Sequence, residues 1–232
     1  MQAAETGIEV PFDAVYQVYV DGKPRMETRI SLARKDGHWL MSNDGKGTKG
    51  LPRMLKFRNH ERSEGEFVDG LFQPHRYSSE TRVAGKDDLW SAEFSLDENS
   101  ITTQHEDGSA SLEPAAGTVD PLSLTLAMRH HLGAGQTGFQ IKLVDETEID
   151  LHDYQASAPE NLDTDLGCFE VVPLKRIRKN STRYSQGWYA SELAHIPLRL
   201  QHGKEGGKEF EMRITSLQID GKPVTASADC PS

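Results

Sequence analysis

The feature that most constrains this chain is a two-residue alternation of apolar and polar side chains, interrupted at short intervals by turn residues. Residues 12–20 place apolar side chains on one face, and residues 26–32 resume the alternation after the turn Asp21-Gly22. This period is that of a strand with one buried face, and Asp-Gly is typical of a β-hairpin turn. Further strands are predicted within 38–42, 66–77, 88–97, 101–113, 139–143, 149–152, 168–178, 184–190, 195–202 and 208–219, with a second Asp-Gly turn at Asp69-Gly70. Short strands without a βαβ rhythm indicate a mainly β fold, built as an antiparallel meander.

The length and net charge of the chain limit the classes of protein to which it could belong. The chain has 232 residues, of which 36% are hydrophobic and 27% charged. That length suits one all-β domain over 1–232, with an ordered core from about 10 to 220 and peripheral tails at 1–9 and 221–232. The net charge of -10 argues against a general nucleic-acid binder, which needs a dominant positive field. No apolar run approaches the roughly 20 residues of a membrane span, so we expect no spanning segment.

Two segments break the β pattern and are predicted to be short helices. In GTKGLPRMLKFRNH, 47–60, Pro52 suits the first helical position, and an apolar stripe about two turns long recurs at helical spacing. In DPLSLTLAMRHHLGAG, 120–135, Asp120 is a good N-cap and Gly133 a natural residue just past the helix end. The second helix is apolar on nearly all sides, so we expect it to be buried in the concavity of a curved sheet. The first is expected to close one end of that sheet as a lid, held by Leu51, Met54 and Leu55, with Arg58 continuing its stripe.

The motifs that would signal chemistry are absent or misplaced. GAGQTG at 133–138 matches the dinucleotide fingerprint in its letters, but it follows a helix and precedes a strand, which is the reverse of what that motif needs. His130 and His131 are neighbours on a helix and do not face one another as two ligands of one metal would. No metal-binding motif and no activated-nucleophile motif occurs in the sequence. We therefore expect no enzyme, no metal and no cofactor.

Two clusters of positive charge stand out in this acidic chain. No carboxylate lies between Lys46 and His60, and none lies from Val171 to Ser191. Such runs are commonly solvated faces, but each could also form the basic rim of a site for an anionic head group or an acidic partner. The residues assigned to this rim are Lys49, Arg53, Lys56, Arg58, Lys175, Arg176 and Arg178.

The two cysteines and the N-terminus bear on the compartment. In an oxidising compartment Cys168 and Cys230 could form a disulfide that pins the C-terminal tail and adds about 4 kcal/mol in the chain-entropy model. Otherwise Cys168 would be a small buried apolar residue and Cys230 a tail thiol, and the sequence leaves both alternatives open. Small polar residues follow Met1, as they do after a signal-peptidase site, and no signal segment is present. Export with a removed signal peptide is favoured over a native cytosolic start.

Five spaced motifs resemble a known family. The chain is similar, over about residues 10–218, to the bacterial exported-protein family catalogued as domain of unknown function 3108. The resemblance rests on PFDAVYQVYVDGKPRMETRISLAR, GTKGLPRMLKFRNHERSEGEFVDGLFQPHRY, DPLSLTLAMRHHL, TDLGCFEVVPLKRIR and GWYASELAHIPLRLQ. It implies a periplasmic location and an architecture like that of the LolA/LolB lipoprotein-localisation carriers, in which a strongly curved antiparallel sheet, an open or half β-barrel, wraps around helices. The family has no established activity, so it supplies no catalytic residues.

This architecture suggests three functions. A half-open barrel has a concave apolar face that its own side chains need not fill, and the remaining space can hold an acyl chain. The first hypothesis is therefore a periplasmic carrier of a lipid-like or amphipathic ligand, the second an envelope adaptor with a filled core and a protein partner, and the third, with least support, an enzyme acting on envelope polymers. The residues expected to line the ligand site, or else to be plain core, are Trp39, Leu51, Met54, Leu55, Trp90, Phe94, Leu126, Phe139 and Trp188.

Overall fold

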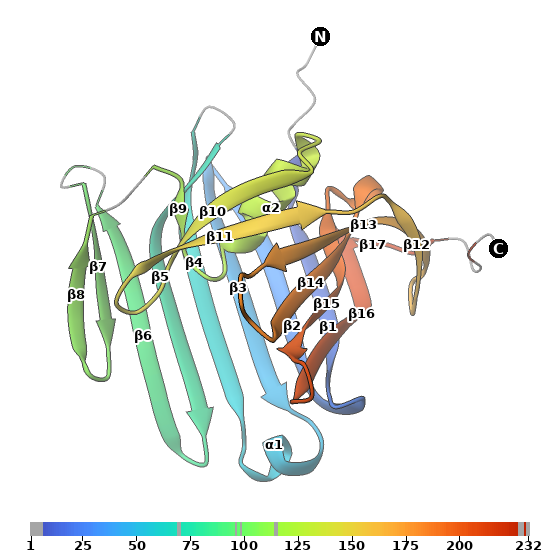
Figure 1. Ribbon diagram of the computed structural model, residues 1–232, viewed down its shortest axis with the longest axis horizontal. Coiled ribbons are helices and arrows are strands. Elements are labelled where there is room, and N and C mark those ends of the chain that lie inside the picture. The colour runs from blue at the N-terminus through green and yellow to red at the C-terminus, as the bar shows by residue number, and fades with distance from the viewer. Residues whose placement is uncertain are drawn as a thin grey trace.

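The dominant feature of the computed structural model is one long, strongly curved sheet (Figure 1). The structure describes residues 7–68, 71–95, 97, 99–113, 116–226 and 230. The first half of the sheet is a run of antiparallel hairpins, each strand paired with the next. Its strands are β1 (Phe12–Val20), β2 (Lys23–Lys35), β3 (His38–Gly47), β4 (Arg58–Val68), β5 (Leu71–Val83), β6 (Lys86–Ser95), β7 (Ser100–His105) and β8 (Gly108–Leu112).

The second half of the sheet returns to the first strand. β16 pairs with β1, so the spatial order runs from β8 through β1 to β16, β15, β14, β13, β11, β10 and β9, while β12 pairs with β13 and β17 with β16. These strands are β9 (Thr118–Val119), β10 (Gly138–Val144), β11 (Ile149–Ala156), β12 (Glu160–Thr164), β13 (Gly167–Ile177), β14 (Arg183–Ala190), β15 (Ile196–Lys204), β16 (Glu209–Ile219) and β17 (Lys222–Pro223). Each predicted segment contains strand, whereas β9, β12, β17 and residues 58–65 of β4 were not foreseen.

Positive backbone torsions set the hairpins. Asp21 and Gly22, between β1 and β2, have φ values of 50° and 72°, and Asp36 and Gly37, between β2 and β3, have 53° and 83°. Two consecutive left-handed residues make the turn whose twist matches the flanking strands. The Asp21-Gly22 turn is therefore confirmed, while Asp69-Gly70 lies outside the described residues.

The sheet bends into an open barrel that does not close. Its two edges are β8 and β9, and no strand pairing joins them within the described ranges. A contact does cross this seam, because the Thr103 hydroxyl on β7 donates to the Glu146 carbonyl in the β10–β11 turn. β8 ends at Leu112, and β9 begins at Thr118 and runs parallel to β10. The expectation of a mainly β, strongly curved open sheet is confirmed, and the expectation that it is wholly antiparallel is wrong at the β9–β10 pair.

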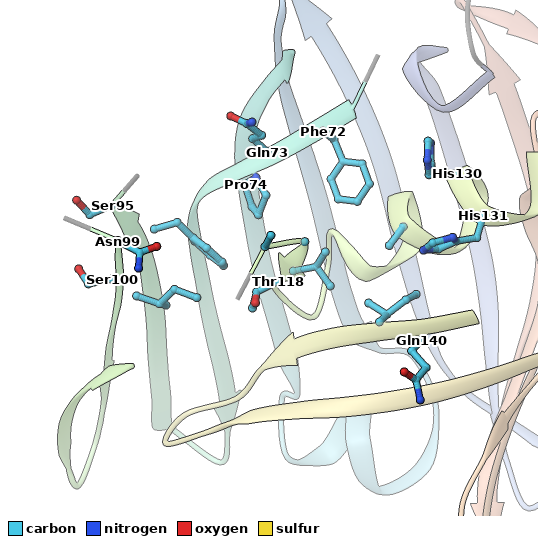
Figure 2. Close-up of a pocket in the computed structure, with 17 residues that line it drawn as sticks. Phe72, Gln73, Pro74, Ser95, Asn99, Ser100, Thr118, His130, His131 and Gln140 are labelled. Carbon is cyan, nitrogen blue, oxygen red and sulfur yellow. The ribbon is translucent and has the colours of Figure 1, made fainter. Parts of the chain in front are cut away.

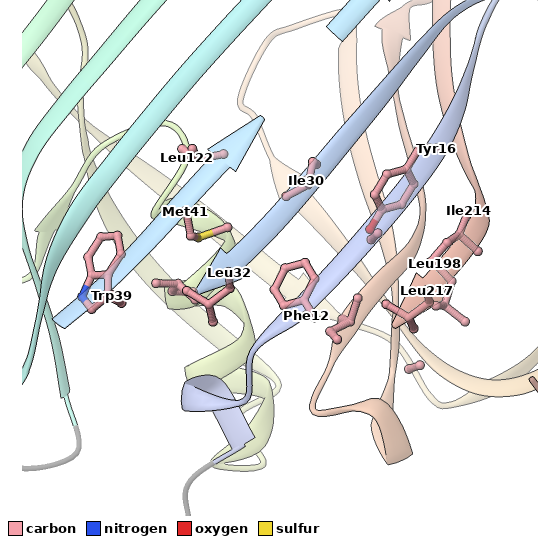
Figure 3. Packing of buried hydrophobic residues seen from close by; sticks show 14 of the residues in the cluster. Phe12, Tyr16, Ile30, Leu32, Trp39, Met41, Leu122, Leu198, Ile214 and Leu217 are labelled. Atoms are coloured by element: carbon pink, nitrogen blue, oxygen red, sulfur yellow. The ribbon is translucent and has the colours of Figure 1, made fainter. Parts of the chain in front are cut away.

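The core covers the inner face of the sheet around β1. Alternate residues of β1, Phe12, Ala14 and Tyr16, are at most 4% exposed. Figure 3 shows how these side chains meet those of β2, β3, β15 and β16, including Ile30 and Ile214. The period-two pattern therefore encodes the buried face, as predicted.

Helix α2 (Leu124–Gly133) lies inside the curve. Leu126 packs with the β1–β3 side of the core, and Ala127 and Leu132 pack with Ile141 and Tyr154 of β10 and β11. A turn precedes the helix, in which the Asp120 carboxylate accepts the amide hydrogens of residues 122 and 123, each at 2.9 Å. The predicted burial is confirmed. The predicted N-cap is wrong, because the helix starts at Leu124 with Ser123 at its N-cap position, and Asp120 holds the turn before it. The helix ends two residues late, so Gly135, with φ of 72°, takes the left-handed position expected for Gly133.

Helix α1 (Gly50–Met54) is a correction. It begins at Gly50, so Pro52 lies within its first turn instead of opening it, and Arg58 starts β4 instead of extending the helix. Leu51 and Met54 are 63% and 78% exposed, so they do not fasten the helix to the sheet. Backbone hydrogen bonds hold this segment in place, including one of 2.9 Å from the Thr48 amide to the Arg25 carbonyl.

Both predicted tails are partly attached to the core. In the 3-10 helix η1 (Gly7–Glu9), Ile8 is 3% exposed, and β17 pairs with β16. Cys168 and Cys230 form a disulfide across 62 residues, with their Cα atoms 5.0 Å apart. Of the two alternatives for the cysteines, the structure therefore has the bond.

Candidate functional site

A cavity of about 590 Å³ opens where the barrel fails to close. It lies between β5, β6 and β7 on one side and β9, β10 and α2 on the other (Figure 2). Its apolar lining includes Phe72, Pro74, Phe94, Ile101, Val119, Ala127 and Ile141. We call this space the seam cavity.

The apolar floor of the seam cavity follows from strand register. Phe94 and Ile101 are directly opposite in the β6–β7 hairpin, so their side chains share one face. A register shift where Gly65 opposes Pro74 interrupts the β4–β5 pairing, and bulges of this kind redirect the residues beside them. Figure 2 shows Phe72 projecting from β5 towards α2. Apolar side chains thus converge from several separate elements.

Polar side chains border the apolar floor of the seam cavity. The lining also includes Asn99, Gln140, His130 and His131. The Nδ1 atom of His131 lies 2.7 Å from the Gln136 side-chain oxygen, and its ring stacks on Phe139 at 4.4 Å between centroids. Burial, followed by the neighbouring His131, lowers the pKa of His130, which favours its neutral form. The site therefore offers an apolar surface with hydrogen-bonding groups at its border.

The structure separates most of the aromatic residues that the sequence assigns to ligand binding. Of these, Phe94 lines the seam cavity, and Phe139 lies behind His131. Trp39, 1% exposed, and Trp188, 8% exposed, are core residues whose indole nitrogens donate to the Glu66 carbonyl and to the Glu160 carboxylate.

Trp90 and the apolar helix residues also lie elsewhere. Trp90 packs on Tyr77 at 4.6 Å between centroids, against the core, and borders a separate hollow lined by residues of β5, β6 and β7. Leu126 is fully buried core. Leu51, Met54 and Leu55 lie at α1, and none of them lines the seam cavity.

The predicted basic rim is also divided. None of its seven residues lines the seam cavity: Lys49, Arg53, Lys56, Arg58, Lys175, Arg176 and Arg178. The first four lie at α1 and the start of β4. Arg176 is opposite Tyr154 in the β11–β13 register, and Arg178 donates to the Ser185 hydroxyl at 3.1 Å.

The sequence analysis missed most of this site. Phe72, Ile101, Val119 and Ile141 look like ordinary inward positions of strands, because the cavity depends on a strand pairing that does not form. One available signal was the stretch EPAAG at 113–117, where the alternation stops between the predicted strand over 101–113 and the predicted helix over 120–135.

Within the parts of the chain that the structure describes, no group of three or more His, Cys, Asp or Glu could hold a metal ion. The described helices include none long and apolar enough to cross a membrane. What the seam cavity offers is shape, apolar area and a few polar contacts.

Comparison with known proteins places the fold. The chain is similar to a β-barrel-like protein of the domain of unknown function DUF1849 from Brucella abortus, with a TM-score of 0.60 and 11% identity over 90% of this chain and 98% of that chain. A candidate lipoprotein from Parabacteroides distasonis has a TM-score of 0.37 and 8% identity, covering 90% of this chain and 95% of that one. A candidate exported protein with a YmcC-like fold from Bacteroides fragilis has a TM-score of 0.36 and 9% identity, covering 89% and 95%.

The first of these comparisons shows a shared β-barrel-like fold, and the two weaker ones carry no argument here. No protein-family model and no curated protein matches the chain. The resemblance to domain of unknown function 3108 therefore stays a prediction.

Proposed function

We propose that this protein is a non-catalytic binding or carrier protein for a lipid-like or amphipathic ligand, whose apolar part occupies the seam cavity. The observation that carries the proposal is the cavity itself, about 590 Å³ with an apolar floor and a polar border. Small-molecule sites commonly have volumes of about 300–1,000 Å³ and this same division of lining. No cofactor is needed for such a role.

We propose further that the protein works in the periplasm. The Cys168–Cys230 disulfide supports this, because structural disulfides persist in oxidising compartments and are rare in the cytosol. The bond attaches Cys230, near the C-terminus, to β13. An exported protein would benefit from that attachment outside the cytosol.

The fluorescence of N-phenyl-1-naphthylamine, a neutral apolar probe, tests the binding proposal. The wild-type protein should bind the probe, and Phe94→Ala should weaken binding about tenfold, because one aromatic wall of the cavity is lost. Trp90→Ala is the matched control, since it removes an aromatic of the same hairpin strand that does not line the cavity. Equal loss in both variants, or no binding by the wild type, would contradict the proposal.

A second candidate function, an envelope adaptor with a protein partner, draws on α1. Leu51 and Met54 are exposed beside Lys49 and Arg53, a combination suited to an acidic partner with an apolar contact. An envelope pull-down with the double variant Lys49→Glu, Arg53→Glu tests it: a partner that is retained unchanged would count against this role.

A further inference from the structure

Arg129 on α2 is a buried cation without a counter-ion. Its side chain is fully buried. Its Nε atom donates to the Ala194 carbonyl at 2.9 Å and its Nη2 atom to the Gly7 carbonyl at 2.8 Å. The Nη1 atom is buried and has no acceptor, and no carboxylate of the described ranges forms an ion pair with this guanidinium. Since arginine is rarely buried unless paired, an acceptor is missing here.

The Phe12 ring offsets only part of the cost of burying the Arg129 charge. The Arg129 guanidinium carbon lies 5.1 Å from the centroid of that ring, within range of a cation–π contact. Burial lowers the pKa of Arg129 to about 10, so the side chain stays a cation at neutral pH. An aromatic face and two carbonyls do not supply the negative charge that would balance it.

A second cavity lies beside this cation. It has a volume of about 320 Å³, and its lining includes Arg129, its two carbonyl partners Gly7 and Ala194, and the imidazoles of His130 and His195. Burial, followed by Arg129, lowers the pKa of His195, so that imidazole is neutral at pH 7 and can donate an N–H without adding a charge. We call this space the Arg129 cavity.

His130 is common to the two cavities. It lines both the seam cavity and the Arg129 cavity, so the two spaces lie next to each other on either side of this residue. Figure 2 shows His130 at the edge of the seam cavity, next to His131 on α2. A ligand with an apolar chain in the seam cavity could therefore place its other end beside Arg129.

We propose that the Arg129 cavity binds the anionic head group of the ligand, so that the ligand is an amphiphile with a carboxylate or phosphate on one end of an apolar chain. This inference rests on the proposed function and adds the class of ligand. A charged oxygen would supply the acceptor that Nη1 lacks, and hydrogen bonds between charged groups are the strong ones. Arg129 thus takes the role that the sequence assigns to the exposed basic clusters.

Arg178 is a less suitable candidate for binding an anionic head group. Arg178 also has a buried Nη1 atom without an acceptor. However, Arg178 and Arg176 are only half-buried and line neither of the two cavities. They serve as the comparison for the test instead.

Displacement of N-phenyl-1-naphthylamine tests the inference. The competitors are dodecanoate, its uncharged methyl ester, dodecyl phosphate and inorganic phosphate. In the wild type, dodecanoate and dodecyl phosphate should displace the probe at concentrations about tenfold lower than the methyl ester, as hydrogen bonding to a buried charge predicts. Arg129→Gln should abolish this preference while the probe still binds, and the exposed Arg53→Gln and the half-buried Arg178→Gln should retain it.

Each outcome separates the two proposals. Probe binding with no preference for the charged competitors would overturn the inference and leave the proposed function standing. Absence of probe binding would overturn the proposed function. Binding of inorganic phosphate as tight as that of dodecyl phosphate would also overturn the inference, because the anion would then bind apart from a chain.

The test does not depend on one variant. The comparison of dodecanoate with its methyl ester uses the wild type alone, and it stands if Arg129→Gln does not fold. The variant His195→Leu keeps Arg129 and removes a neighbouring donor, so it should reduce the preference about threefold. A wild-type preference that is unchanged in both Arg129→Gln and His195→Leu would overturn the inference.

Discussion

The two helices look alike in sequence and differ in their surroundings. Each has a proline near its start, apolar residues three or four apart, and basic residues towards its end. In α2, Leu126 is fully buried, whereas Met54 in α1 is 78% exposed. α2 has sheet walls on two sides, and α1 follows β3 at the end of a long hairpin. Apolar spacing therefore shows that a helix can pack against a sheet. Whether a sheet face lies beside the helix depends on the topology of the chain.

The largest expected effect is on stability at these two positions. Leu126→Ala should lower the free energy of unfolding by about 3 kcal/mol, because it leaves a cavity between two sheet walls. Met54→Ala should change it by less than about 0.5 kcal/mol, as exposed substitutions do. Denaturant unfolding measures both, and similar losses in the two variants would break the comparison.

The next largest difference in stability is expected at the residues that precede the two helices. Asp120→Ala removes the acceptor of two backbone amides and of the buried Ser63 hydroxyl, at 2.6 Å, so it should cost about 2 kcal/mol. Lys49, at the N-cap position of α1, makes no side-chain capping bond, and Lys49→Ala should cost less than about 0.5 kcal/mol. Thermal unfolding of both variants checks this; a loss at Lys49 equal to that at Asp120 would show that α1 is held as α2 is.

The wall around α2 should also give stability a pH dependence. Burial, followed by Arg176, lowers the pKa of His152 to about 4, and this residue is opposite Ile141 of the seam cavity in the β10–β11 register. A histidine with a lowered pKa contributes stability that is present above its unfolded pKa of about 6.5 and is lost as the pH falls towards about 4. The free energy of unfolding should fall by about 2 kcal/mol across this window.

His152→Gln isolates that contribution. Burial raises the pKa of Asp120, which acts in the opposite direction, so the difference between wild type and variant is the quantity to measure. The variant should show a smaller fall between pH 6.5 and pH 4. An identical fall in both proteins would mean that another group titrates.

The smallest effect is expected from the charges of α1. The double variant Lys49→Glu, Arg53→Glu should leave the affinity for N-phenyl-1-naphthylamine within about twofold of wild type, because neither residue lines the seam cavity and surface charges act weakly at a distance. Fluorescence titration measures this. A larger change would connect α1 with the ligand site after all.

The sequence was sufficient to predict those parts of the fold that depend on local patterns of residues. Alternation over residues 12–20 and the Asp21-Gly22 turn define the first hairpin, and the apolar character of 122–128 predicts a buried helix. The two cysteines left the disulfide open, because pairing depends on the distance between β13 and the C-terminal segment.

The site could not be predicted in the same way. Its cavity arises where β8 and β9 do not pair, a non-local outcome that no single segment carries. The aromatic residues singled out by size, such as Trp39, fill the core instead. Nothing in the sequence singled out Arg129, because its burial without a neighbouring carboxylate is visible only in the folded structure.

Native mass spectrometry of the protein purified under gentle conditions tests the central claim most directly. The wild type should carry a non-covalent amphiphile, because the seam cavity of about 590 Å³ favours an apolar chain over water. Ser100→Trp, which places an indole at the lining of the cavity, should lose this adduct, and Ser109→Trp on the exposed side of β8 should keep it. An adduct retained equally in both variants, or a wild-type protein that carries none and does not bind the neutral probe, would contradict the assignment of the seam cavity as a ligand site.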